Sequence, residues 1–593
     1  MLKQLHVIIH LVVFFLIIGQ AANAKPVATI STAEIKPGMK GYGLTVFQGT
    51  EPERFDVEVV DVVPNFLLRQ DIILIQCKHP VTDKAGVIGG MSGSPIYLNG
   101  KLAGALAYGW RFTKDALAGV TPIENMFNIT RRRQRGSTRK NPVTPLAALQ
   151  KPLEHLKARF VDTFFNRLNN RRDTNLVPAR TPLSVSGFTG ESYRMLENAL
   201  TPFGLEPMQG GGSGAADEGP EKFVEGAAIG VQMIRGDLSA TGIGTVTTTF
   251  NGQVLAFGHP MFNMGESYLP VTAARIHTVI ASMARSNKLG SPLRELGTLV
   301  QDRPAGISAR TDLRASMIPV TFHITDKRSG VHETYNISVA ERQWLTSTLI
   351  HSALVKFVET ATSDMTDVSA QIQGRIKIAG RPVIQLQDEG VARKGLAELV
   401  SWFRPAQVVQ LILGNPYEDA RIEWMEFDVN LDYGLSFSYV KGAYLTAENP
   451  LPGETINLNV RLVDYGGDEQ IVTVPIDIPK NAIAQKMKLT IGGGNDMAPA
   501  LPTPENLDDL IANVRRLHPA NALVVTMETP GESLNIRGQV LSDLPASVAA
   551  ALNPGTGDDD TKHYRHLQTR IVRLDTFVSG KYSVQITTGR RTK

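Results

Sequence analysis

The chain has 593 residues, of which 42% are hydrophobic and 20% are charged, as in an ordinary globular protein with apolar material for more than one core. Its 61 basic and 57 acidic residues give a net charge of +4, which is too balanced to make nucleic acid the expected partner. The only cysteine, Cys77, excludes an intramolecular disulfide and a cysteine-based metal site.

The first 24 residues have the pattern of a secretory signal peptide. Lys3 supplies a positive start, Val7 to Ile18 is almost entirely apolar, and Ala22-Asn23-Ala24 is a small-x-small cleavage site. The apolar run is about 12 residues long, whereas a bilayer-spanning helix needs ~20. We therefore predict cleavage after Ala24, a periplasmic or extracellular protein, and no stable membrane span after cleavage.

Short strands dominate the next segment, residues 25–130, which we predict to form one β lobe. Alternating and continuous apolar runs indicate strands, and the Asn99-Gly100 pair suits a type I′ hairpin turn. A helical turn is expected within 119–127. The strand patterns lie at 54–63, 71–77 and 96–108.

Residues 131–222 are predicted to form a connector. Residues 131–140 carry six basic residues and are interpreted as a solvated linker, with contact to an anionic surface as the alternative. Apolar residues at helical spacing indicate an amphipathic helix over 153–168, and 208–222 is a glycine-rich linker.

A second β lobe is predicted over 223–310, again with Asn-Gly and glycine-rich turns. Residues 311–424 combine strands with a helix over 342–361. From about 425 to 593 the strands alternate as in a β-sandwich, accompanied by a helix near 505–517 in an accessory C-terminal region.

The stretch from Gly86 to Trp110 carries the chemistry of greatest interest. It reads GVIGGMSGSPIYLNGKLAGALAYGW and holds Ser92 between glycines. A serine hydroxyl becomes a good nucleophile only with a base in reach and with donors that bind the oxyanion. A turn around Ser92 could supply the donors through the amides of Gly90 and Ser92, and Ser94 is then a structural neighbour.

The same stretch, with FDVEVVDVVPN before it and GVTPIENM after it, resembles the nucleophile region of the SpoIVB serine peptidase family. More distantly, it resembles chymotrypsin-like double β-barrels. The family also has a histidine in a G-I-G-T…G-H context, and TGIGTVTTTFNGQVLAFGHPMF supplies it here. The resemblance implies that Ser92 is the nucleophile and His259 the base, and it covers roughly residues 35–126 and 225–310.

Three features depart from the family pattern. Ser92 precedes His259 by 167 positions, whereas the family's histidine segment comes first. Cys77 stands where the resemblance implies the triad acid, so Asp83 and Asp237 are the candidate substitutes. No PDZ module is recognisable. Triads are defined by geometry and not by chain order, so a permuted arrangement of two lobes is compatible with the chemistry.

The predicted fold is therefore mainly β with some α: a permuted trypsin-like double β-barrel followed by a β-sandwich-like module. The predicted function is an exported serine endopeptidase acting on protein or peptide substrates, with no cofactor and no metal, since no metal-ligand spacing occurs. The alternative is a catalytically inactive peptidase-like scaffold of the cell envelope that binds protein or glycan. Substrate specificity and oligomeric state are left open.

Overall fold

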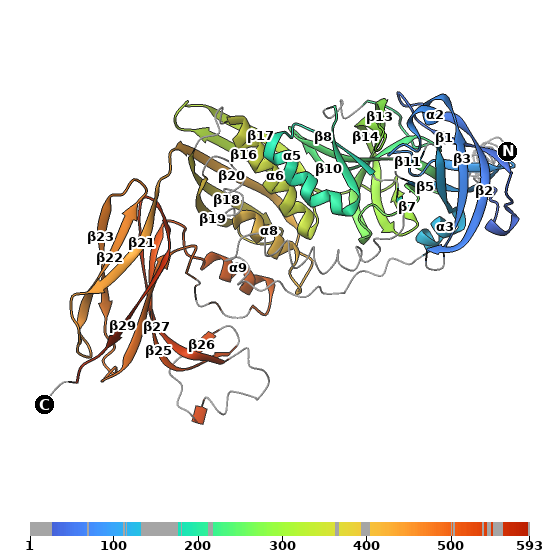
Figure 1. Ribbon diagram of the computed structural model, residues 1–593. Coiled ribbons are helices and arrows are strands. Elements are labelled where there is room, and N and C mark those ends of the chain that lie inside the picture. The colour runs from blue at the N-terminus through green and yellow to red at the C-terminus, as the bar shows by residue number, and fades with distance from the viewer. Residues whose placement is uncertain are drawn as a thin grey trace, which may run out of the picture.

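The computed structural model shows a chain built mainly from β-strands (Figure 1). The predicted signal peptide, the basic run beyond Arg131, and the helix predicted over 153–168 lie outside the residues that the structure describes. Apart from a few single positions, those residues are 27–67, 70–110, 115–131, 176–178, 181–211, 218–361, 367–392, 404–497, 504–536, 539–541 and 561–590.

Six strands of the N-terminal sheet form a closed barrel. The sheet runs β4-β1-β2-β3-β6-β5-β7, and an additional pairing of β4 with β5 closes the ring. The short helices α2 (Pro80–Ala85) and α3 (Ile123–Arg131) flank it. The strands are β1 (Lys40–Thr45), β2 (Glu53–Leu67), β3 (Gln70–Lys78), β4 (Pro95–Leu98), β5 (Lys101–Trp110), β6 (Leu117–Pro122) and β7 (Leu176–Pro178).

The hairpin of β4 and β5 follows from its turn residues. Asn99 and Gly100 have φ angles of 51° and 73°, the pair of positive values that a type I′ turn requires. The strands on either side are almost wholly buried. The hairpin therefore fixes the chain directly after the turn that carries Ser92.

A second closed barrel lies within the large, 13-stranded sheet. Its order includes β10-β13-β14-β15-β12-β11, and β11 pairs back with β10. The chain thus forms two six-stranded barrels, which confirms the predicted double-barrel fold. The strands are β10 (Ala228–Gly236), β11 (Ser239–Phe250), β12 (Gln253–Ala256), β13 (Gly265–Ile280), β14 (Asn287–Arg303) and β15 (Gly306–Arg310).

The large sheet continues beyond the second barrel on both sides. Five strands in the order β19-β18-β20-β16-β17 extend it from β10, and β8 and β9 extend it from β11. Helix α6 (Gln343–Ala361), where a helix was predicted, contacts α5 (Gly190–Leu200) and α8 (Arg404–Leu413). The added strands are β8 (Thr181–Ser186), β9 (Leu205–Gln209), β16 (Met317–Asp326), β17 (His332–Ala340), β18 (Val368–Ile378), β19 (Ile384–Ala392) and β20 (Ile422–Tyr433).

The C-terminal region packs two smaller sheets around one core that contains Leu458, Leu489 and Val525. They lie at the opposite end of the molecule from the first barrel (Figure 1). The sandwich starts at β21, because β20 pairs with β16 and β18 of the large sheet. The sheets are β23-β22-β21-β28 and β26-β25-β24-β29, with β27 paired to β25.

The strands of the sandwich and the helix beside it have the following bounds: β21 (Phe437–Leu445), β22 (Thr455–Asp464), β23 (Glu469–Asp477), β24 (Lys486–Gly493), β25 (Ala522–Ile536), β26 (Gln539–Leu541), β27 (Thr561–Arg573), β28 (Phe577–Ser579), β29 (Lys581–Thr587) and α9 (Leu507–Arg515). Helix α9 lies where a helix was expected from the sequence. Within the described part of the chain, no helix combines the length and apolar character needed to cross a bilayer.

Candidate active site

Ser92 lies in a tight turn between α2 and β4. Gly90 and Gly93 on either side have φ angles of 93° and 99°, a region that favours glycine because it has no Cβ. The Met91 amide donates to the Ile88 carbonyl at 3.0 Å, and the Gly93 amide donates to Leu106 of β5 at 2.7 Å. The glycines predicted to shape this turn are therefore required by its backbone geometry.

Strand β11 of the second barrel holds this turn through its backbone and its threonine hydroxyls. The Thr245 amide donates to the Ser92 carbonyl at 2.8 Å, and Thr245 Oγ1 donates to the Gly90 carbonyl at 2.8 Å. Thr247 Oγ1 donates to the Gly93 carbonyl, again at 2.8 Å. The segment with Ser92 comes from the first barrel but is fixed by the second.

The turn that carries His259 is held in the reciprocal way by the first barrel. Phe257 and Gly258, directly before it, have φ angles of 68° and 66°, so the chain turns sharply after β12. Thr121 Oγ1 of β6 donates to the Gly258 carbonyl at 2.6 Å. A Cβ on Gly258 would lie 3.0 Å from the Cβ atoms of Ala105 and Ala107, so the turn lies directly on β5.

The two turns meet at the interface between the barrels. A Cβ on Gly93 would lie 1.9 Å from the Thr245 carbonyl oxygen and 2.5 Å from the backbone nitrogen of Phe257, two residues before His259. Ser92 and His259 have exposed fractions of 0% and 2%. The structure thus brings both predicted segments together, and a peptide carbonyl can reach them only if covering side chains move.

The imidazole of His259 is oriented by the backbone next to it. Its Nδ1 lies 2.9 Å from the Pro260 carbonyl oxygen. A carbonyl can only accept a hydrogen bond, so this contact requires the proton on Nδ1 and leaves Nε2 as the basic nitrogen of the neutral ring.

Asp302, near the end of β14, holds the loop that follows His259. Its carboxylate accepts hydrogen bonds from the amides of Met261 at 2.9 Å and Phe262 at 2.7 Å, with Met264 at 3.4 Å. Asp302 is fully buried, and burial raises its pKa although the amides oppose the rise. Sequence reasoning missed this residue, since its only signal is a carboxylate at the end of the apolar run LGTLV.

The carboxylates predicted as triad acids are both exposed, whereas His259 is buried. Asp237 is exposed at the turn between β10 and β11, where it accepts a hydrogen bond from the Asn336 amide at 2.6 Å. Asp237 precedes Thr245, the residue that holds the Ser92 turn, by eight residues. At the rise of a β-strand, this separation corresponds to about 26 Å along the chain. Asp83 is exposed on α2. Cys77 is buried on β3, and burial raises the pKa of its thiol to about 12, so it stays protonated.

A buried cation, Lys288 of β14, packs against the Ser92 turn. Its amide donates to the Gly89 carbonyl at 3.0 Å, and its side-chain carbons would lie 3.1–3.3 Å from a Cβ on Gly90. Its Nζ donates to Thr45 Oγ1 at 2.7 Å and to Thr245 Oγ1 at 3.5 Å. Burial lowers the pKa of Lys288 to about 7. No pattern in the sequence singled this lysine out.

The described residues include one group with the composition of a metal site. Ligand atoms of His323, Glu426 and Asp428 lie within 4.8 Å of one another. Arg375, however, forms ion pairs with both carboxylates, at 2.7 Å to Glu426 and 3.2 Å to Asp428. The guanidinium already neutralises them, so we interpret the group as an ion-pair network.

Comparison with known proteins gives one family match. Residues 17–127 match the family described as SpoIVB peptidase S55. The match includes Ser92 and the whole Gly86–Trp110 stretch, whereas His259 lies outside it. No curated protein and no solved structure matches the chain significantly.

Proposed function

We propose that this chain, whose residues 17–127 match the SpoIVB peptidase S55 family, is an exported serine endopeptidase that hydrolyses peptide bonds in protein substrates. Export follows from the signal-peptide pattern that ends at Ala24. The competing function is a catalytically inactive envelope scaffold that uses the same barrels to bind protein or glycan.

The observation that carries the proposal is the reciprocal anchoring of two turns at the barrel interface. Thr245 of the second barrel holds the Ser92 turn, and Thr121 of the first barrel holds the His259 turn. Two segments far apart in the sequence are thereby fixed against each other. Serine hydrolases need such a pairing of nucleophile and base, whatever the order of the residues in the chain.

In the proposed reaction, Ser92 Oγ attacks the scissile carbonyl while His259 Nε2 takes the hydroxyl proton. The amides of Gly90 and Ser92 donate to the oxyanion of the tetrahedral intermediate. The imidazolium then gives its proton to the leaving amine, and the acyl-serine remains. Water, deprotonated by the same imidazole, hydrolyses that ester and regenerates Ser92.

The orienting role of a triad acid falls to the chain around His259 in this proposal. The Pro260 carbonyl accepts from Nδ1, and Asp302 fixes the following loop as a positioning residue. Asp237 and Asp83 were the sequence candidates for this role. Both are exposed, and Asp237 is engaged with Asn336, so we favour the Pro260–Asp302 arrangement. A carbonyl stabilises an imidazolium less than a carboxylate does, which predicts modest turnover.

The test is active-site labelling of the full-length protein with a fluorophosphonate probe. Ser92→Ala should abolish labelling, and His259→Ala should reduce its rate by at least 100-fold. Ser94→Ala is the matched control, because Ser94 is equally buried two residues away and should remain non-essential. Labelling that persists in Ser92→Ala would remove Ser92 from the mechanism. A folded wild-type protein that neither labels nor cleaves casein would favour the scaffold function.

A further inference from the structure

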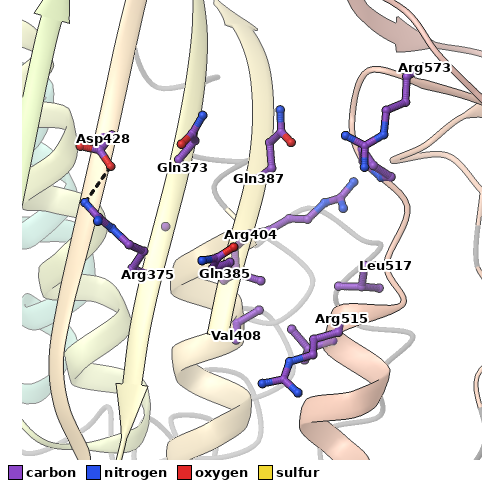
Figure 2. Close-up of a pocket in the computed structure, with 14 residues that line it drawn as sticks. Gln373, Arg375, Gln385, Gln387, Arg404, Val408, Asp428, Arg515, Leu517 and Arg573 are labelled. Atoms are coloured by element: carbon purple, nitrogen blue, oxygen red, sulfur yellow. Dashed lines mark hydrogen bonds and ion pairs between the residues drawn. The ribbon is translucent and has the colours of Figure 1, made fainter. Parts of the chain in front are cut away.

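A groove lies between the outer strands of the large sheet and the C-terminal region, with a volume of about 530 Å³ (Figure 2). Strands β18 and β19 form one wall, helix α9 stands opposite them, and the end of β27 contributes Arg573. In the order of the large sheet, β19 is the end strand and β12, which leads to His259, lies nine strands away. The groove is therefore separate from the candidate active site.

The groove is rich in arginine, although Arg404 forms an ion pair with the buried Asp388, and Arg375 forms ion pairs with Glu426 and Asp428. Its lining includes Arg375, Arg404, Arg515 and Arg573, and Asp428 is the only acidic residue among the lining residues that the structure describes. Figure 2 shows the guanidinium groups on both sides of the groove. Guanidinium groups bind carboxylate and phosphate in bidentate geometry, so this excess of positive charge favours an anionic ligand.

Part of this charge is available to a ligand. Arg515 and Arg573 are exposed, and neither forms an ion pair or side-chain hydrogen bond with another described residue. Arg375 pairs with Asp428 through Nη2, but its buried Nε has no hydrogen-bond partner among the residues described. Arg375 Nε is buried, so the charge that a ligand can reach comes from Arg515 and Arg573.

Exposed amide side chains line the strand wall in register with these charges. Gln373 of β18 lies opposite Gln387 of β19, and Arg375 lies opposite Gln385. All three glutamines are exposed. A carboxamide both donates and accepts hydrogen bonds, as a peptide group does. The wall thus offers alternating partners to a chain that carries both peptide groups and carboxylates.

The strand that forms the lip of the groove has no described strand partner on its outer side, although α9 and β28 contact this strand. β19 is the terminal strand of its sheet, and no other described strand pairs with its outer side. Alternate N–H and C=O groups along Gln385–Gln387 therefore have no ladder partner within the described ranges. Such an edge can take up an extended peptide as an additional strand, which a polysaccharide cannot mimic.

We propose that this groove binds an extended, acidic polypeptide segment, which adds to the edge of β19 and places its carboxylates against the arginines. The backbone would pair with Gln385–Gln387, and the acidic side chains would reach Arg515 and Arg573. This site would recruit a protein partner or hold a substrate away from Ser92. The proposal does not depend on peptidase activity.

The test is fluorescence anisotropy with the full-length Ser92→Ala protein, so that no peptide is consumed. The probe is a fluorescein-labelled decapeptide that alternates Glu with Val, compared with the same peptide carrying Gln for Glu. The acidic peptide should bind at least tenfold more tightly, and its affinity should fall as salt rises. Equal affinity for the two peptides would overturn the proposal.

Variants locate the site. Arg515→Gln combined with Arg573→Gln should weaken acidic-peptide binding at least tenfold, whereas Arg516→Gln with Arg590→Gln, the same charge change outside the lining, should change it less than threefold. Both pairs are exposed, so thermal unfolding should be unchanged. A groove variant that binds normally would contradict the assignment.

A third comparison separates strand addition from simple charge attraction. Two further peptides carry N-methyl groups at either the odd or the even positions, which keeps the charge but removes the backbone donors along one edge of the extended peptide. The peptide that is methylated along the edge facing β19 should bind at least tenfold more weakly than the parent peptide. If both N-methylated peptides bind as the parent does, or if alginate displaces the peptide at equal charge concentration, the groove recognises anionic polymers and not an added strand.

Discussion

Lys288 Nζ donates a 2.7 Å hydrogen bond to Thr45 Oγ1, joining β14 of the second barrel to β1 of the first. The lysine has an exposed fraction of 1%, and its hydrogen-bond partners given by the structure are hydroxyls. A buried ammonium without a carboxylate beside it loses its hydration with little compensation, and the pKa falls to about 7. The barrel interface next to Ser92 thus contains a group that titrates near neutral pH.

Lys288→Met should remove a pH dependence of stability. The unfolded chain binds this proton up to its ordinary pKa near 10.5, whereas the folded chain releases it above about 7. The unfolded state therefore binds more protons between these values, and stability rises with pH across the window. The full pKa shift of Lys288 corresponds to a change of roughly 5 kcal/mol in the free energy of unfolding across this pH window.

The measurement is the melting temperature of wild type and variant from pH 6.5 to 10.5. Wild type should gain stability relative to Lys288→Met as the pH rises, and the exposed Lys78→Met should run parallel to wild type. Parallel curves for Lys288→Met and wild type would mean that the lysine keeps its ordinary pKa when folded.

Gly93→Ala should damage the site far more than Gly100→Ala. Both glycines have positive φ, so an alanine costs about 1 kcal/mol of backbone strain at each. Only at Gly93 would the new Cβ meet backbone, at 1.9 Å from the Thr245 carbonyl oxygen, whereas nothing lies within 4 Å at Gly100. We expect Gly93→Ala to lose fluorophosphonate labelling. We also expect its free energy of unfolding to fall by about 3 kcal/mol, as for a steric clash in a buried site. Equal behaviour of the two variants would contradict the interlocked turns.

Asp302→Asn should misplace His259 without removing it. An asparagine can accept at only one of its two side-chain positions, so the amides of Met261 and Phe262 can no longer both be satisfied. We expect a loss of about 1–3 kcal/mol in stability. A merely structural role would leave the His259 tautomer unchanged. The ¹⁵N shifts of His259 should instead show reduced Nδ1 protonation in the variant, while exposed Asp312→Asn should show the wild-type spectrum.

Much of the fold could be predicted from local patterns. Asn99-Gly100 indicates its own turn geometry, and the apolar runs around Ile73 and Val57 indicate strands whatever their partners are. The segments of Ser92 and His259 were also recognisable, because each reactive residue stands beside glycines that a sharp backbone turn requires. These features depend on residues close together in the sequence.

The supports of the site could not be predicted in this way. Asp302 matters because β14 pairs with β15 and β13 and so brings its carboxylate to the loop after His259. Lys288 matters because β1 and β11 meet it from two barrels. Asp237 was one of two candidates because it precedes the histidine strand, but the length of β11 separates it from the end of the barrel that carries His259. Such placements depend on strand register and barrel closure, which have no local signal.

A second bridge between the barrels should show measurable coupling. Tyr97 Oη of β4 donates to Glu225, whose other oxygen accepts from Thr248 Oγ1 of β11 at 2.7 Å. Burial, and then the neighbouring Glu225, raise the pKa of Tyr97, so the phenol stays protonated and remains a donor. A double-mutant cycle of Tyr97→Phe and Glu225→Gln should give a coupling energy of about 1–3 kcal/mol. Tyr97→Phe with the exposed Glu333→Gln is the control pair, for which we expect a coupling near zero. Additive effects of Tyr97→Phe and Glu225→Gln would show that this contact does not hold the barrels together.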